Sequence, residues 1–313
     1  MQQVSGLIFK ELIKRGYSLE GKTRVWNIAD SKLWYLTPEQ SQGFLDLENS
    51  VEYRKKVIQQ EIDLIKNNAN SFLGQLRNTP INIIELGCGD GKKAVIFIEK
   101  LKKEVKLRYC PIDISSYMVK KAIDKVRKMN VGEVVEFQWN ISDFENLENI
   151  SEVLRKDEFK TNLFLLLGNT LGNFEINELL YGIKEGMVIG DFLLIGNGLD
   201  NRNRRDILKS YDTKEINNWL IKIVEGIGLN EEDVKFESVF NNSRVEGYYI
   251  IKKDFKVSFQ GKEINFINGD RILVFISYKY NDWDFRSFIK MYFSNTEFFI
   301  SKDNSYALAF CKK

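Results

Sequence analysis

A short run of polar residues and glycines, ELGCGDGKK at Glu85–Lys93, has the residue types and spacing of a ligand-binding loop. An acid, Glu85, follows a mostly apolar run, INII, and is followed by three glycines that alternate with other residues and then by two lysines. Glycine permits a tight turn and lets the backbone approach a ligand closely, and a helix that begins after the turn offers free N–H groups. We therefore expect Gly87 and Gly89 to lie against a bound ligand.

The order of residues in this loop distinguishes between two kinds of nucleotide. A dinucleotide site has the pattern G-x-G-x-x-G, with a pyrophosphate on the following helix. This loop has no third glycine at that spacing, and Glu85 stands at the end of the predicted strand, where it would repel a pyrophosphate. An acid there suits a positively charged ligand group, such as the amine and sulfonium of S-adenosylmethionine (SAM).

Further acids follow the next two predicted strands. Asp113, in CPIDIS, lies at the distance from the glycine loop where an acid accepts hydrogen bonds from both ribose hydroxyls. In NISDFENL, Asp143 and Phe144 are placed to bond the adenine amino group and to stack on its ring. The glycine loop alone is a weak signal, and its alternative is an ordinary α/β core with incidental turn residues. Together, the sites at three successive strand ends predict a SAM site.

The elements that would position these residues follow from the hydrophobic pattern between Pro80 and Gly198. Short β-rich runs alternate there with segments whose apolar residues recur near a helical period. This alternation predicts a parallel sheet with right-handed crossovers and helices on both faces. The predicted strands are INIIEL, VKLRYCPID, VVEFQWN, TNLFLLLG and DFLLIGNG.

The rest of the chain departs from this pattern. Residues 1–70 are predicted to be largely helical and to contribute to the substrate subdomain, and residues 71–199 to form the SAM-binding Rossmann-like core. Residues 200–282 have alternating strands and are predicted to form an inserted substrate subdomain. Residues 283–313 predict a helix and a β-hairpin, which would add an antiparallel pair of strands to the core sheet.

Composition excludes several classes of function. The net charge is +2, from 46 basic and 44 acidic residues, which argues against a nucleic-acid-binding surface. No apolar run approaches the ~20 residues of a membrane helix, and the N-terminus lacks the apolar core of a signal peptide, so we expect a cytoplasmic protein without membrane contact. The three cysteines, Cys88, Cys110 and Cys311, form neither a disulfide framework nor a zinc site, and no metal is expected.

The chain contains no histidine. The commonest general base is therefore missing, and with it every nucleophile that a histidine would activate. Chemistry must rely on positioning and electrostatics, or on Asp, Glu, Tyr, Lys or Asn side chains.

The fourth predicted strand leads into LFLLLGNTLGNFE, which resembles the segment LGSTIGNF of the histidine-specific SAM-dependent methyltransferases, the ergothioneine-pathway enzymes and their relatives. The motifs ELGCGDGKK, CPIDIS, DF, SYDT and SYKY resemble motifs of that family in the same order. The resemblance covers roughly residues 50–313. It implies an α/β fold, the Rossmann-like sheet of class I SAM methyltransferases with an inserted α+β substrate subdomain.

The resemblance also implies roles for individual residues. Carried over residue by residue, it implies cofactor contacts at Gly87, Lys93, Asp113, Asp143 and Phe144. It implies acceptor contacts at Asn173, Tyr211 and Ser277, and at Gly168, which we also count with the cofactor residues. The family also has an N-terminal tyrosine motif, and its counterpart in this chain is Tyr53, in VEYRKK, which the resemblance implies as a further acceptor residue.

The acceptor motifs match the family only in part. Histidine-methylating members hold the imidazole with a glutamate two residues before the late serine, and that position is Phe275 in LVFISYKY. Free histidine is therefore expected to be a poor acceptor, and the true acceptor is expected to have an apolar or aromatic part near Phe275.

These features predict an enzyme, a SAM-dependent N-methyltransferase that acts on a small amino-acid-like amine. Asn173 and Tyr211 would orient the acceptor, because an amine that is bound neutral, with its pKa depressed by desolvation and the nearby sulfonium, needs no strong base. Two alternatives are methylation of a protein or peptide amine, which would need an open cleft, and a SAM-binding partner subunit that does not catalyse.

Overall fold

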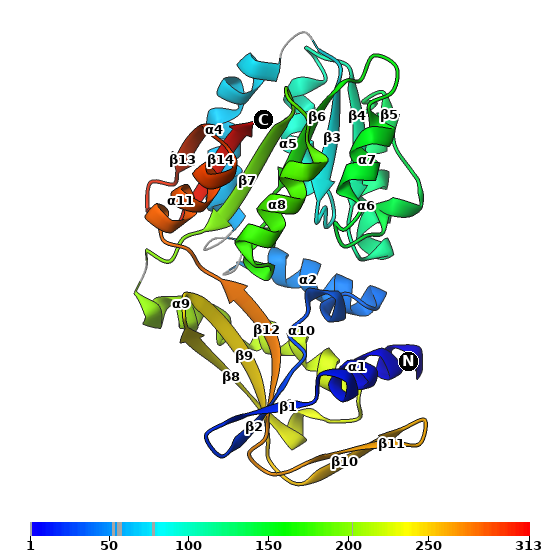
Figure 1. The fold of residues 1–313 in the computed structure, drawn as a ribbon, viewed down its shortest axis with the longest axis vertical. Coiled ribbons are helices and arrows are strands. Elements are labelled where there is room, and N and C mark those ends of the chain that lie inside the picture. The colour runs from blue at the N-terminus through cyan, green and yellow to red at the C-terminus, as the bar shows by residue number, and fades with distance from the viewer. Residues whose placement is uncertain (1, 52–53, 55–57, 77–78, 202) are drawn as a thin grey trace. The chain divides into compact units, whose positions relative to one another are not determined.

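The computed structural model describes residues 2–51, 54, 58–76, 79–201 and 203–313. Tyr53, one of the predicted acceptor residues, lies outside these ranges. The chain forms two compact units, which are described separately (Figure 1). The core unit comprises Glu48–Arg202 and Lys279–Lys313, and the accessory unit comprises Met1–Leu47 and Asn203–Tyr278.

The core unit is built on a seven-stranded sheet in the order β13-β14-β7-β6-β3-β4-β5. Neighbouring strands from β7 to β5 pair in parallel, whereas β14 is antiparallel to both β7 and β13. The strands are β3 (Ile81–Leu86), β4 (Leu107–Ile112), β5 (Glu133–Val134), β6 (Thr161–Leu166), β7 (Phe192–Gly198), β13 (Asn295–Ile300) and β14 (Tyr306–Lys312). The predicted Rossmann-like α/β sheet is confirmed.

The register of this sheet brings three strand ends to the same level. Leu86, the last residue of β3, lies opposite Ile112 of β4 and Leu166 of β6. Every residue of β3 and β4 is buried, as expected for strands that are covered on both faces. The segments that follow β3, β4 and β6 therefore begin side by side at the carboxyl edge, where open α/β sheets bind ligands.

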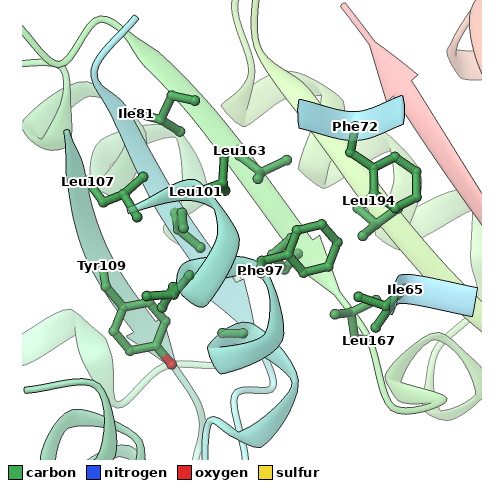
Figure 2. Packing of buried hydrophobic residues seen from close by; sticks show 14 of the residues in the cluster. Ile65, Phe72, Ile81, Phe97, Leu101, Leu107, Tyr109, Leu163, Leu167 and Leu194 are labelled. Atoms are coloured by element: carbon green, nitrogen blue, oxygen red, sulfur yellow. The ribbon is translucent and has the colours of Figure 1, made fainter. Parts of the chain in front are cut away.

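Helices of the core unit pack on this sheet through their apolar faces. Phe72 of α4 and Phe97 of α5 contact one another and belong to one buried cluster with Ile81, Leu163 and Leu194 of the sheet (Figure 2). The helices are α4 (Gln59–Leu76), α5 (Lys92–Leu101), α6 (Ser116–Arg127), α7 (Leu147–Leu154), α8 (Ile176–Gly186) and α11 (Asp282–Tyr292). The predicted boundary at residues 70 and 71 falls inside α4.

The accessory unit contains a five-stranded sheet in the order β1-β2-β12-β9-β8 and a separate hairpin, β10-β11. Its strands are β1 (Tyr17–Glu20), β2 (Thr23–Asn27), β8 (Val234–Asn241), β9 (Arg244–Ile251), β10 (Phe255–Phe259), β11 (Lys262–Phe266) and β12 (Arg271–Tyr278). Its helices are α1 (Gln2–Arg15), α9 (Arg204–Tyr211) and α10 (Lys214–Glu225), together with most of α2 (Pro38–Asn49).

Two segments differ in detail from a simple reading of the sequence. The N-terminal segment contains helices and also a hairpin of β1 and β2, with Gly21 at its turn at φ +62°. All four residues of β1 are exposed, although apolar and polar residues alternate along the strand. The run VVEFQWN yields only the two-residue strand β5, and its later residues form the 3₁₀ turn Gln138–Asn140.

Candidate active site

The glycine loop after β3 adopts backbone conformations that favour glycine. Gly87, Gly89 and Gly91 have φ values of +68°, +51° and +73°, in the left-handed region that other residues adopt at a cost. The N–H groups of Gly87 and Cys88 donate to the Ile112 carbonyl at 2.8 and 3.1 Å, which fixes the loop to the end of β4. A Cβ on Gly89 would meet no atom within 4 Å, so the backbone faces open space at this point.

Asp113 lies directly beside this loop at the end of β4. Its Oδ2 accepts the Gly89 N–H at 3.1 Å, and its Oδ1 accepts the Ser115 N–H at 3.0 Å. Burial raises the pKa of Asp113 to about 6, although the backbone N–H groups of Ser115 and Gly89 oppose the shift. The carboxylate retains lone pairs beyond these two bonds and can accept hydroxyl donors. The structure therefore brings together Asp113 and the glycine loop, as the motif spacing predicts.

The segment after β5 is tied to the same strand end. Asp113 donates its N–H to the Asn140 carbonyl at 2.9 Å, and Ser142 donates to the Asp113 carbonyl at 3.0 Å. Asp143 and Phe144 follow directly, and Phe144 has a φ of +73°, an unfavourable value for an aromatic residue. Strained backbone of this kind clusters at functional sites. The Phe144 ring lies 5.6 Å from that of Phe174, between centroids.

Glu85 has a partner inside the protein. Its side chain is buried on the α5 face of β3, where its Oε2 accepts the hydroxyl of Tyr109 on β4. Burial raises the pKa of Glu85 to about 8, although the bond from Tyr109 and the charge of Lys93 oppose the shift. The neutral carboxyl group is therefore favoured at pH 7. This position shows a hydrogen bond that holds β3 to β4, and not the ligand-facing charge that the sequence suggests.

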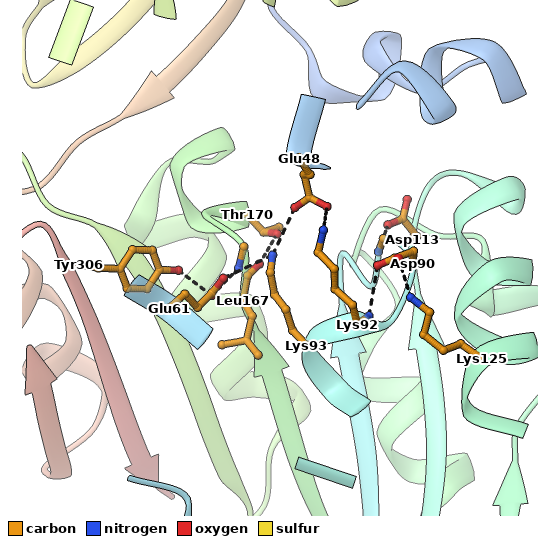
Figure 3. Close-up of polar contacts among 12 residues, drawn as sticks. Glu48, Glu61, Asp90, Lys92, Lys93, Asp113, Lys125, Leu167, Thr170 and Tyr306 are labelled. Carbon is orange, nitrogen blue, oxygen red and sulfur yellow. Dashed lines mark hydrogen bonds and ion pairs between the residues drawn. The ribbon is translucent and has the colours of Figure 1, made fainter. Parts of the chain in front are cut away.

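Lys93, in the first turn of α5, lies among carboxylates from two other helices (Figure 3). Its Nζ is 3.5 Å from Oε1 of Glu48 and 3.4 Å from Oε2 of Glu61, while Lys92 pairs with the other Glu48 oxygen at 2.7 Å. Burial alone would lower the pKa of Lys93, but Glu61 and Glu48 raise it, and the net shift is upward. Lys93 therefore stays charged at neutral pH.

Glu61 and Tyr306 are residues that the sequence motifs do not reveal. Glu61 Oε1 accepts the Tyr306 hydroxyl at 2.6 Å and the Gly168 N–H at 2.7 Å. Tyr306 begins β14, more than half the chain away from Glu61 on α4. The sequence pattern that could have revealed Glu61 is an acid on the apolar face of α4, in line with the buried residues Leu64 and Ile65.

The loop after β6 carries Gly168 and Asn173. Gly168 has a φ of +77°, and a Cβ on it would lie 2.1 Å from Lys93 Nζ. Asn169 Oδ1 accepts the Gly198 N–H at 2.6 Å, which fixes this loop to the end of β7. Asn173 ends the short 3₁₀ helix Thr170–Asn173 and is half-buried. The cap of α8 is Glu175, whose carboxylate accepts two N–H groups of the first turn.

The remaining predicted acceptor residues lie together in the accessory unit. The hydroxyls of Tyr211, at the end of α9, and Ser277, on β12, are 3.0 Å apart. The Tyr211 ring stacks on that of Phe275 with centroids 5.6 Å apart and planes 14° apart. Phe275 itself is only 4% exposed. Tyr211 therefore covers one face of the Phe275 ring.

Phe275 is held by aromatic neighbours and by a glycine. The rings of Phe236 and Trp34 lie 6.5 and 6.4 Å from its ring, between centroids. Gly247 lies opposite on β9, where a Cβ would approach the Phe275 ring to 2.0 Å, so the absence of a side chain creates the space for this ring. The residue is part of a packed aromatic cluster.

A parallel sheet with a glycine loop after β3 and an acid after β4 defines a Rossmann-like nucleotide-binding protein. Residues 40–313 match the family described as histidine-specific methyltransferase, SAM-dependent, and the chain belongs to this family. It is therefore a SAM-dependent methyltransferase. The open face of Gly89 and the adjacent Asp113 carboxylate fit the cofactor, since they offer room for its backbone approach and an acceptor for its ribose hydroxyls.

Individual relatives and solved structures share little sequence identity with this chain. Ergothioneine biosynthesis protein 1 of Schizosaccharomyces pombe is 24% identical over 265 residues, which cover 79% of this chain and 34% of the relative. The chain thus spans about a third of this curated relative's length. A SAM-dependent methyltransferase from Clostridium acetobutylicum is 11% identical, with 87% of this chain and 98% of that chain covered and a TM-score of 0.45. The plantazolicin methyltransferase BpumL is 16% identical, with 77% and 83% covered and a TM-score of 0.39.

Within the described ranges, no helix is long and apolar enough to cross a membrane. The same part of the chain contains no group of three or more Cys, Asp or Glu side chains that could hold a metal ion.

Proposed function

We propose that the protein transfers the methyl group of SAM to the nitrogen of a small amino-acid-like amine, and that free histidine is a poor acceptor. The observation that carries the proposal is the neighbourhood of Tyr211. Its hydroxyl lies beside that of Ser277, and its ring lies on Phe275, where a histidine methylator has a carboxylate. Polar hydroxyls and aromatic surface are therefore presented side by side.

The residues of the core unit are assigned to the cofactor. Gly87 and Gly89 let the backbone approach the ligand, Asp113 accepts the ribose hydroxyls, and Asp143 and Phe144 bind the adenine. The charged Lys93 is assigned to the cofactor carboxylate. When bound, SAM supplies an electrophilic methyl group on a sulfonium, and the protein must hold the acceptor lone pair in line with that bond and exclude water. Such positioning lowers a barrier by about 7–11 kcal/mol in favourable cases.

Asn173, Tyr211 and Ser277 are assigned to the acceptor. Each offers an uncharged polar group that can orient an amine or a carboxylate by hydrogen bonds. The acceptor nitrogen attacks as the neutral amine, and desolvation favours this form because it disfavours the ammonium ion. The proton released after transfer can pass to solvent, so the absence of histidine from the chain is no obstacle to this reaction.

The case against free histidine is a matter of hydrogen-bonding partners. An imidazole N–H needs an acceptor, and a carboxylate would provide a charge-assisted one. Phe275 has no acceptor atom, and the hydroxyls of Tyr211 and Ser277 offer only uncharged oxygens, which are weaker acceptors than a carboxylate. An imidazole N–H that loses its charge-assisted partner costs about 1–3 kcal/mol. An acceptor with an apolar or aromatic side chain avoids this cost.

An acceptor screen tests the proposal. The purified protein is incubated with methyl-labelled SAM and each free amino acid or simple amine, and in parallel with a cell extract that is fractionated by size. We expect label in a small molecule, and transfer to histidine at least about tenfold slower than to the best apolar or aromatic amino acid, following the cost of one unmade bond. Efficient trimethylation of histidine would contradict the proposal. Label in a protein band would favour a protein acceptor, and no transfer at all would favour a non-catalytic subunit.

The acceptor assignment also predicts a separation of binding from transfer. Asn173→Ala and Tyr211→Phe should each lower methyl transfer by about tenfold, the worth of one lost hydrogen bond. Tyr211→Phe keeps the ring on Phe275, so the loss is confined to the hydroxyl. Calorimetric titration with SAM should give affinities within about twofold of wild type. A loss of SAM affinity as large as the loss of transfer would place these residues in the cofactor site instead.

A further inference from the structure

The Glu61 carboxylate joins three parts of the core unit at the carboxyl edge of the sheet. It projects from α4 and is 1% exposed. One oxygen accepts the Gly168 N–H and the Tyr306 hydroxyl, and the other lies 3.4 Å from Lys93 Nζ (Figure 3). A Cβ on Gly196 of β7 would come within 3.1 Å of Glu61 Oε1, so this glycine leaves room for the carboxylate.

The contacts of Glu61 couple the positions of Lys93 and Gly168. Lys93 Nζ lies so near the Gly168 backbone that a Cβ there would be 2.1 Å away. If Glu61 moved, the Gly168 amide would lose its acceptor and the ammonium would lose one of its two carboxylate partners. The positions of α5 and of the loop after β6 therefore depend on the same side chain.

Such a cluster is not explained by stability alone. A buried ion pair pays a desolvation penalty that often cancels its Coulomb energy, so it is weak evidence for stabilisation of the fold. Of the three groups that Glu61 contacts, two, Lys93 and Gly168, belong to the residues assigned to the cofactor.

We propose that Glu61 is a positioning residue for the cofactor: it holds the Lys93 ammonium and the Gly168 backbone where SAM binds. The proposal rests on the assignment of these two residues to the cofactor, and not on the identity of the acceptor. Tyr306 donates its hydroxyl to the same Glu61 oxygen but carries no charge, which makes it a matched control.

The charge of Glu61 has a consequence of its own. The titratable groups that face Lys93 are Glu61 of α4, Glu48 of α2 and Glu85 of β3. Glu61 and Glu48 have the larger effects among them, and they raise the pKa of Lys93 against the effect of burial. Burial lowers the pKa of Lys93, and Glu61 is one of the carboxylates that counteract this effect. Removal of the Glu61 charge therefore lowers the pKa of Lys93. Cofactor binding through a charged Lys93 would then weaken at lower pH than in the wild type.

The test measures binding of S-adenosylhomocysteine to the full chain by calorimetry across pH, which needs no acceptor and no turnover. Glu61→Gln is nearly isosteric and removes only the charge. We expect it to weaken binding about tenfold or more at neutral pH. We also expect this variant to lose further affinity as the pH rises toward about 10, the ordinary pKa of lysine, because its Lys93 loses the proton at a lower pH than in the wild type. The ligand amine titrates alike in every variant, so the difference between variants reports on the protein.

Tyr306→Phe should leave the affinity for S-adenosylhomocysteine within about threefold of wild type, even if Tyr306→Phe and Glu61→Gln both melt at lower temperature than the wild type. Glu61→Asp keeps the charge, so the high-pH loss should stay where the wild type has it. In a Lys93→Met background, Glu61→Gln should have little further effect, since the two side chains act together. Wild-type affinity in Glu61→Gln, equal losses in Glu61→Gln and Tyr306→Phe, or full additivity with Lys93→Met would overturn the proposal. Failure of the acceptor screen would leave this result unaffected.

Discussion

Replacing Asp113 by alanine is expected to weaken SAM binding by about 2–4 kcal/mol, the worth of two hydrogen bonds from hydroxyls to a carboxylate. The substitution also removes the acceptor of the Gly89 N–H, so the glycine loop loses a contact that holds it to β4. Calorimetric titration of the wild type and the variant with SAM measures the difference. Equal affinities would show that Asp113 does not bind the ribose.

The pH dependence of the same titration provides an internal control. Because burial raises the pKa of Asp113 to about 6, the carboxylate is protonated below that pH and accepts hydrogen bonds less well. Wild-type affinity should be nearly constant above about pH 7 and fall by up to about tenfold per unit below about pH 6. Asp113→Asn has no charge to lose, and its weaker affinity should not change over this range. A fall of the same size in Asp113→Asn would assign the titration to another group.

Phe275→Ala is expected to lower the free energy of unfolding of the accessory unit by about 3–5 kcal/mol, as for other buried phenylalanines. The ring fills the space above Gly247 and lies against Tyr211, Phe236 and Trp34, so its removal leaves a cavity. Urea denaturation followed by tryptophan fluorescence measures the change, since Trp34 belongs to the same cluster.

Leu19→Ala is the control for this variant. Leu19 lies in the accessory unit as well, but it is 66% exposed, and its substitution should change stability by no more than about 0.5 kcal/mol. If Phe275→Ala cost no more than Leu19→Ala, the aromatic cluster would not be packed as described. The large expected cost also means that Phe275→Glu, which buries a carboxylate in this cluster, is unsuited to a test of acceptor preference.

The parallel strands and the glycine loop could be predicted because each is encoded locally. β3, β4, β6 and β7 are short apolar runs bounded by turn residues, and helices with a clear apolar period separate most of them. The proximity of Asp113 to Gly89 then follows from topology alone, since neighbouring parallel strands end at the same edge. Sequence motifs therefore suffice where the site is made of strand ends.

The parts that escaped prediction depend on contacts between distant segments. Glu61 meets Tyr306 only because α4 packs beside β14 in the core unit, and no local pattern records that pairing. Glu85 shows the opposite case, because its place at a strand end suggested a ligand contact while the fold turned its side chain toward Tyr109. β1 is only four residues long, and all four residues are exposed.

The position of β14 has a consequence for synthesis of the protein on the ribosome. β14 lies between β7 and β13, so the hydrogen-bonding edge of β7 stays open until residues 306–312 have emerged from the exit tunnel. The whole of the accessory-unit segment 203–278 is translated in that interval. A nascent chain with an unpaired, apolar β7 edge is a template for pairing with other chains. Translation that stalls between β7 and β14 would therefore release a product prone to aggregate, and not a partly active enzyme.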